Sequence, residues 1–170
     1  MGIFDKLFGK TESTDTAVYE DLTVYAPVEG TAIKLEDFPD KIFAGGAMGQ
    51  GCGIEPQQEI LYAPFDGEIS TLSDTLHAVG ITGKNGIELL IHIGVDTVDM
   101  DGKGFLSKVK NGENVKKGDE LIHFSRDAIK EAGHPDTIAV IVINSDDYAS
   151  VDMREISSVH AGEILLTLTK

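Results

Sequence analysis

Hydrophobic and polar positions alternate along most of this chain in short runs that glycine, proline and asparagine separate. Short alternating runs with such punctuation are typical of β-strands joined by turns. Strands are predicted at residues 120–125, 137–143 and 163–169, and the run at 137–143 is almost wholly apolar, which indicates a central strand. One short helix is predicted at 126–132, because Gly133-His134-Pro135 would end it.

The strongest hairpin signal is Asn85-Gly86, which apolar runs flank on both sides. His77 and His92 lie on either side of this turn. If residues 83–86 all form the loop, the two histidines are directly opposite. If only Asn85-Gly86 forms it, they are diagonal neighbours. Side chains alternate between the faces of a strand, so both registers predict the two imidazoles on one face, with Cβ atoms roughly 5 Å apart when directly opposite.

A repeated motif suggests how the strands are organised. Residues 22–30 and 60–67 share Tyr-Ala-Pro, two further residues and glycine. This echo predicts a duplicated β motif whose two related halves pack into one antiparallel β-sandwich with one minor short helix. The segment 36–49 reads as an irregular connection with several large apolar residues, which either plug the sandwich or form a docking patch.

Length and composition support one packed domain at residues 19–170, since the chain has 170 residues and is 41% hydrophobic. Residues 1–18 are predicted to be a flexible tail. Within it, apolar residues in 1–10 have the spacing of a short amphipathic helix, which would give a weak membrane contact.

Charge and cysteine content narrow the function. The formal net charge of −15 argues against nucleic acid as a partner. A single cysteine, Cys52, excludes an internal disulfide and is expected to be a small buried residue in a reducing compartment. The sequence has no apolar stretch of about 20 residues and no secretory pattern, which predicts a cytoplasmic protein.

The remaining chemistry centres on His77, His92 and Asp96, because phosphate-binding loops, nucleophile elbows and paired Cys-x-x-Cys motifs are missing from the sequence. His123, His134 and His160 are interpreted as ordinary residues, since the sequence shows no convincing polar partner for them. Two imidazoles among Leu, Val and Ile are costly to bury without a function. They could share a proton, a metal ion or a transferred group.

Three segments carry a family resemblance: 88–98 (ELLIHIGVDTV), 75–81 (TLHAVGI) and 36–56. They resemble the glucose-type enzyme IIA of the bacterial phosphoenolpyruvate-dependent sugar phosphotransferase system, and the similarity extends over about residues 20–170. The sequence departs from its relatives mainly at Ala47, Met48 and Ser73, which affects the specificity for partners rather than the reaction.

The resemblance implies that the phosphocarrier HPr donates a phosphoryl group to His92, which passes it to a cysteine of a sugar-transporter IIB domain. His77 would donate a hydrogen bond to the phosphoryl oxygens, Thr75 would fix the His77 tautomer, and the Gly94 carbonyl would accept from His92. No cofactor or metal is implied. Partner docking would involve Asp40, Ile42, Phe43, Ala47, Met48, Leu90, Asp96 and Val98, and regulatory partners would distinguish the phosphorylated from the unphosphorylated form.

Two alternatives for the function are weaker, and one alternative for the role of Asp96 stays open. His92-x-x-x-Asp96 matches part of a zinc-hydrolase ligand set, but three ligands are usual and the expected His-x-His pair is absent. Gly112-x-x-Val115-x-x-Gly118 resembles a turn of lipoyl and biotinyl carrier domains. Those domains carry a lysine in a hairpin between methionines, and this sequence has no such lysine. Asp96 could also cap the turn after its strand instead of lying at the rim of the site.

Overall fold

A computed structural model describes residues 21–155 and 157–170. In this part of the chain, the strands form three antiparallel sheets, ordered β13-β2-β3-β11-β7-β6-β5-β9, β1-β14-β12 and β4-β10-β8. The strands are β1 Thr23–Tyr25, β2 Gly30–Lys34, β3 Gln50–Pro56, β4 Ile60–Tyr62, β5 Gly67–Leu72, β6 Ala78–Gly83, β7 Glu88–Ile93, β8 Phe105–Ser107, β9 Asn114–Val115, β10 Glu120–Phe124, β11 Ile138–Val142, β12 Ser150–Met153, β13 Ser158–Val159 and β14 Ile164–Thr169. The prediction of an all-β antiparallel sandwich is confirmed.

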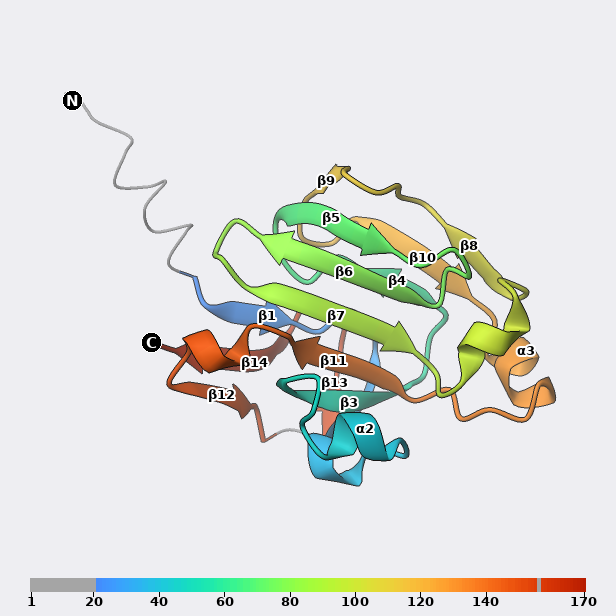
Figure 1. Ribbon diagram of the computed structural model, residues 1–170, viewed down its shortest axis with the longest axis horizontal. Coiled ribbons are helices and arrows are strands. Elements are labelled where there is room, and N and C mark those ends of the chain that lie inside the picture. The colour runs from blue at the N-terminus through green and yellow to red at the C-terminus, as the bar shows by residue number, and fades with distance from the viewer. Residues whose placement is uncertain (1–20, 156) are drawn as a thin grey trace.

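The large sheet has a core on each face. Figure 1 shows its strands β5, β6, β7, β11 and β3 in front, with β1, β4 and β10 of the small sheets behind them. The main core joins the inner face of the large sheet to the small sheets through residues such as Ile91 and Leu121. A second cluster, with Phe38 and Phe43, covers part of the outer face. Strand β11 is buried on both faces, which explains its continuous apolar sequence.

The duplicated motif is visible in the hydrogen bonds between its two copies. The N–H of Tyr25 donates to the carbonyl of Pro64, and the N–H of Tyr62 donates to the carbonyl of Pro27. Strands β2 and β5, which follow the copies, occupy equivalent places next to the two ends of the large sheet. The two copies of the motif therefore lie side by side in one sandwich, as the repeated motif predicted.

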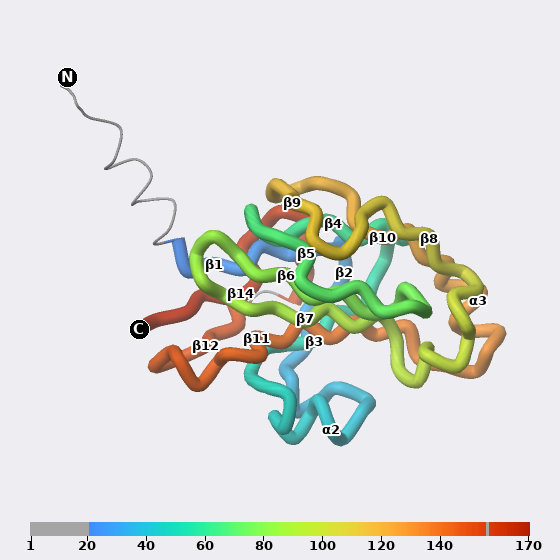
Figure 2. The backbone as a smooth tube through the Cα atoms, turned by 45° about the horizontal axis from the view of Figure 1, so that its top comes forward, coloured from blue at the N-terminus to red at the C-terminus, as the bar shows by residue number. Residues whose placement is uncertain are grey.

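Among the described residues there are two short α-helices, not one. The predicted helix is present as α3, Arg126–Glu131, which Ser125 caps by accepting a hydrogen bond from the Ala128 N–H. The other, α2 at Lys41–Ala44, lies in the segment that was expected to be irregular. It stands out from the large sheet on the side of β3 (Figure 2). The 3₁₀ turns are η1 Leu35–Asp37, η2 Thr97–Met100 and η3 Ser145–Asp147.

The predicted strands at 120–125, 137–143 and 163–169 correspond to β10, β11 and β14. The proposed tail and its amphipathic segment at 1–10 lie outside the described residues. Within 21–155 and 157–170, no helix combines the length and the apolar character that crossing a membrane requires.

Both predicted registers of the hairpin are wrong. The loop has three residues, Lys84–Gly86, because the Gly83 N–H donates to the Ile87 carbonyl at 2.8 Å and closes it. Ala78, not His77, is therefore paired with His92. The extra residue fits because Gly86 adopts a left-handed conformation (φ 88°), as the last residue of a three-residue hairpin loop commonly does.

Candidate functional site

His92 projects from the outer face of β7, beside two small neighbours. Its cross-strand partners are Ala78 on β6 and Ala139 on β11. Methyl groups at both positions leave room above the sheet for large rings. Sequence reasoning missed Ala139, although a single small residue in the apolar run at 137–143 could have indicated a position beside the site.

The His92 ring is held by the turn that follows its strand. Its Nδ1 lies 2.8 Å from the Gly94 carbonyl oxygen, as expected from the sequence. A carbonyl oxygen only accepts, so Nδ1 carries the hydrogen and Nε2 presents its lone pair. Gly94 has a φ of 78°, and a Cβ there would lie 2.5 Å from the Thr97 side chain. Thr97 is fully buried, and its hydroxyl donates to the Ile93 carbonyl at 2.5 Å.

His77 reaches the same face from the loop between β5 and β6. Its ring centroid lies 4.8 Å from that of His92, with the planes at 79°. The Thr75 Oγ1 lies 2.6 Å from His77 Nδ1, so the predicted contact is present. The Ser73 hydroxyl lies 3.4 Å from the same nitrogen and accepts a hydrogen bond from the Ala78 N–H. Sequence reasoning did not anticipate this contact of Ser73.

Both imidazoles are neutral near pH 7. Burial, and secondly the charge of His92, lowers the pKa of His77 to about 4. Burial also lowers the pKa of His92, while the hydrogen bond to Gly94 and the carboxylates of Asp40 and Asp96 act in the opposite direction. A neutral imidazole with a free ring nitrogen is a competent nucleophile.

Phe43 forms a wall of the site rather than an exposed docking residue. It is only 8% exposed, and its ring centroid lies 5.2 Å from that of His92 and 5.6 Å from that of Phe38. Phe43 thus covers one side of His92, and its predicted contact with a partner stays a prediction. Phe38, which was not predicted from the sequence, packs edge to face against the Phe43 ring.

The other predicted docking residues differ in exposure. Ile42 is 62% exposed, Val98 is 55% exposed, and Met48 and Ala47 are also exposed, whereas Leu90 is half-buried. The segment 36–49 is divided between buried and exposed apolar residues, and its role as a docking patch stays a prediction. Phe38 and Phe43 pack against the large sheet, while Ile42 and Met48 remain at the surface.

Asp40 and Asp96 have different local roles. The Asp40 carboxylate caps α2 by accepting from the Ile42 N–H at 2.8 Å, a function that was not predicted. Asp96 has a left-handed backbone (φ 61°) before η2, and its carboxylate makes no capping hydrogen bond with that turn. The capping alternative for Asp96 is therefore wrong, and its carboxylate is exposed near His92.

The three remaining histidines do have polar partners, contrary to expectation. His123 pairs with Glu120 at 2.7 Å, His134 with Asp99 at 2.7 Å and His160 with Glu29 at 3.1 Å. The last two partners are remote in sequence, which is why they were not recognised. These contacts are ordinary surface or half-buried pairs.

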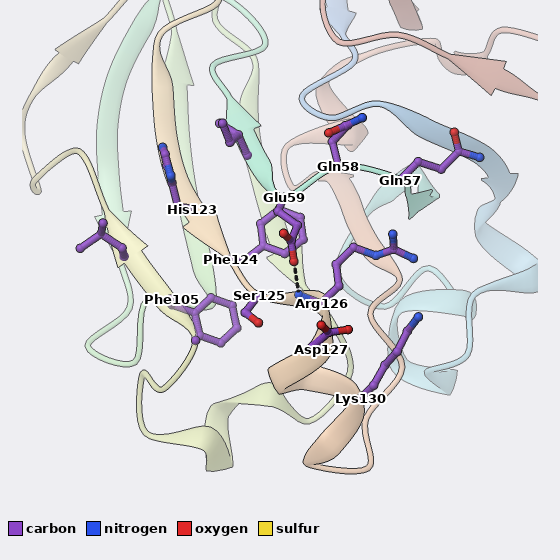
Figure 3. A pocket seen from close by; sticks show the side chains of 13 residues that line it. Gln57, Gln58, Glu59, Phe105, His123, Phe124, Ser125, Arg126, Asp127 and Lys130 are labelled. Carbon is purple, nitrogen blue, oxygen red and sulfur yellow. Dashed lines mark hydrogen bonds between the residues drawn. The ribbon is translucent and has the colours of Figure 1, made fainter.

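An open depression of about 840 Å³ lies away from the histidine pair, between the chain around Gln58 and the start of α3 (Figure 3). Two of its charged residues, Glu59 and Arg126, have partners within the protein. The Arg126 N–H donates to the Glu59 carboxylate, as the dashed line shows, and its guanidinium pairs with Asp136 at 2.9 Å. No residue of the predicted site lines it.

Two further expectations concern cysteine and metal. Cys52 is fully buried, as predicted, and burial raises the pKa of its thiol to about 12. In residues 21–155 and 157–170, no three side chains of His, Cys, Asp or Glu gather closely enough to hold a metal ion. The zinc-hydrolase alternative has no ligand set within this range.

The duplicated sandwich that carries the paired imidazoles matches a known family of phosphotransferase components. The family model of the phosphoenolpyruvate-dependent sugar phosphotransferase system, EIIA 1, matches residues 22–148, and the chain belongs to this family. Its role as a phosphotransferase component of sugar transport follows from that membership.

Particular relatives agree. The glucose-specific EIIA component of Staphylococcus epidermidis is 40% identical over 161 residues, which cover 95% of each chain. The corresponding component of Staphylococcus aureus is 38% identical over the same share of each chain. Among solved structures, the glucose permease IIA from Mycoplasma capricolum is 32% identical, with a TM-score of 0.76 over 85% of this chain and 94% of that one.

Proposed function

We propose that this protein accepts a phosphoryl group from phospho-HPr on Nε2 of His92 and passes it to the cysteine of a IIB domain of a glucose or related sugar transporter. One observation carries the proposal. His92 donates its Nδ1 hydrogen to the Gly94 carbonyl, so its nucleophilic nitrogen is the one that remains free beside His77.

Each transfer exchanges one bond to phosphorus for another. In the first, a bond forms between His92 Nε2 and phosphorus as the bond to the donor histidine nitrogen of HPr breaks. In the second, the cysteine thiolate of IIB attacks phosphorus, the bond to Nε2 breaks, and His92 returns to its neutral form. Such transfers have loose transition states, so the protein mainly positions groups and stabilises peripheral oxygens.

His77 is suited to that stabilisation. When the Thr75 hydroxyl donates to His77 Nδ1, the hydrogen of His77 resides on Nε2 and is available to a phosphoryl oxygen. The lowered pKa of His77 keeps it neutral at rest, and the approach of a dianionic phosphoryl group would strengthen its hydrogen bond.

The surroundings favour relay over hydrolysis. Phe43 covers one side of His92, and Ile42 and Val98 offer exposed apolar surface for a partner that would exclude water during transfer. Asp40 and Asp96 would attract cationic side chains of partners to the rim. Phosphorylation adds about −2 charge at this apolar face, which would also let other proteins distinguish the two forms.

The direct test is phosphorylation with phosphoenolpyruvate, HPr and the phosphoenolpyruvate-dependent enzyme that phosphorylates the HPr histidine. The wild type should acquire one phosphoryl group that is labile in acid and stable in base. His92→Ala should acquire none, whereas His123→Ala, which alters a histidine paired with Glu120, should label normally. Labelling of His92→Ala would overturn the assignment of His92 as the phosphorylated residue.

A second experiment identifies the sugar. Cells that lack this chain should lose phosphorylation of the sugar that it serves.

A further inference from the structure

The His77 side chain lies on the outer face of the large sheet, although a regular continuation of β6 would direct it to the inner face. Val79 and Ile81 point into the main core, so alternation would send residue 77 inward and residue 76 outward. The Ile93 N–H donates to the His77 carbonyl at 2.7 Å, so the ladder itself extends to His77. The side chains nevertheless exchange faces: the His77 ring meets His92, and Leu76 packs against the core.

The exchange occurs at a residue with an unusual backbone. Leu76 has a φ of 63°, which places a non-glycine residue in the left-handed region. Its N–H donates to the Ser73 carbonyl at 2.9 Å, and the Ser73 N–H and hydroxyl close the loop on Ala78 at 3.0 and 3.1 Å. A turn followed by a left-handed residue is a common way to re-enter a strand, but glycine or asparagine usually occupies that position.

We propose that Leu76 is a positioning residue: its left-handed conformation directs the His77 ring to the outer face, and its side chain fills the core place that residue 77 would otherwise take. The effect on phosphoryl transfer rests on the proposed function, whereas the placement of the ring does not. Strain held at one residue beside a reactive site is a recognised form of preorganisation.

Substitutions at Leu76 separate the backbone role from simple packing. Gly and Asn adopt the left-handed region readily but lose the apolar contact, whereas Val keeps most of the side chain and is strongly disfavoured there. A backbone role predicts that Leu76→Gly and Leu76→Asn keep the His77–His92 contact and Leu76→Val loses it. A packing role predicts the reverse order.

Leu72→Val is the matched control. Leu72 is half-buried against the same core, but it lies in β5, where a β-branched residue is favoured. It therefore makes the same change in side chain without the left-handed backbone.

Proton NMR on the unphosphorylated protein gives the first measurement, through the nuclear Overhauser contact between the two rings and the titration of His77. Leu76→Val should lose the contact, and the pKa of His77 should return toward its ordinary value of 6.5. Leu76→Gly, Leu76→Asn and Leu72→Val should retain the contact and the lowered pKa. Leu76→Val could also fail to fold while Leu76→Gly and Leu76→Asn fold. This result would support the backbone role too, because that role predicts that valine is the most damaging of the three residues.

Transfer from the phosphorylated protein to IIB is the second measurement. Leu76→Val should be slower by about tenfold to a hundredfold, since a displacement of about 1 Å can have such an effect. Leu76→Gly should remain within about threefold of wild type on the same scale. A Leu76→Val protein with an intact ring contact, or a Leu72→Val or Leu76→Gly protein that loses it equally, would refute the proposal. If wild type failed to take up phosphate at all, only the proposed function would be lost, because the NMR result does not depend on it.

Discussion

The Nδ1 atom of His92 lies 2.8 Å from the carbonyl oxygen of Gly94, two residues further along the chain. The strand and the turn after it thus fix the tautomer of His92, the proposed nucleophile, without a second side chain. This arrangement depends on the left-handed backbone of Gly94 and on the close approach of Thr97 and Pro135. Substitution of Gly94 should therefore affect both stability and phosphorylation.

Gly94→Ala is expected to destabilise the protein by about 3 kcal/mol or more, because it combines a left-handed backbone with a clash against Thr97. Gly112→Ala is the control, since Gly112 has a φ of 84° and a Cβ there would meet none of the described atoms within 4 Å. It should cost only about 1 kcal/mol. Urea unfolding measures both, and equal losses would mean that the Thr97 contact is unimportant.

His77→Ala should leave His92 able to accept phosphate but slow transfer to IIB by about tenfold to a hundredfold, the effect of losing one hydrogen bond to a charged group. His77→Gln should recover part of the rate, because its amide can donate. Single-turnover transfer to a IIB domain is the measurement. Unchanged transfer in the alanine variant would show that His77 is not the donor.

Thr75→Val keeps the shape of the side chain and removes the hydroxyl 2.6 Å from His77 Nδ1. We expect a fall of about fivefold to tenfold in transfer to IIB, the equivalent of roughly 1 kcal/mol, with little change in folding. Thr75→Ser retains a hydroxyl and should approach wild type. The tautomer of His77, read from ¹⁵N chemical shifts, should become mixed only in the valine variant.

Stability should fall as pH is lowered from 7 to 5, partly because of His77. Burial lowers the pKa of this residue from 6.5 to about 4. Below pH 6.5 the unfolded chain therefore binds a proton at His77, whereas the folded protein binds it only below about pH 4. The stabilisation from neutral His77 is complete above pH 6.5 and is lost progressively down to pH 4. His77→Gln should reduce the loss between pH 7 and 5 by roughly 2 kcal/mol. Denaturant unfolding at both pH values tests this, and parallel losses in the two proteins would argue against a lowered pKa of His77.

Val98→Ala should weaken productive binding of HPr, because Val98 is 55% exposed in the turn that also carries Asp96. The loss of about two methyl groups from a desolvated contact should raise KM by roughly tenfold with little change in kcat. Leu106→Ala is the control, since Leu106 is 57% exposed but lines the depression of Figure 3, which neither His77 nor His92 lines. If both variants raised KM equally, the docking face would need to be reassigned.

The sequence by itself determined the strand content, the duplication and the two histidines that lie together in the candidate site. Residues such as those of β11 carry an apolar pattern that only a covered central strand explains, and the Tyr-Ala-Pro echo marks equivalent positions in two halves. These are local or repeated signals, so they can be recognised without coordinates. The contacts of Thr75 and Gly94 with the histidines were also predictable, since each joins residues only two positions apart.

The tertiary structure alone decided the register, the burial of Phe43 and the route by which His77 reaches His92. A three-residue loop shifts the ladder by one residue, which would separate the imidazoles if the strand geometry were regular. The left-handed backbone of Leu76 brings the two imidazoles together again. The sequence indicates neither the three-residue loop nor the left-handed leucine. The physical reason is that register and strained conformations are set by the packing of the whole sandwich, because a single residue adopts a costly backbone only where many surrounding contacts hold it there.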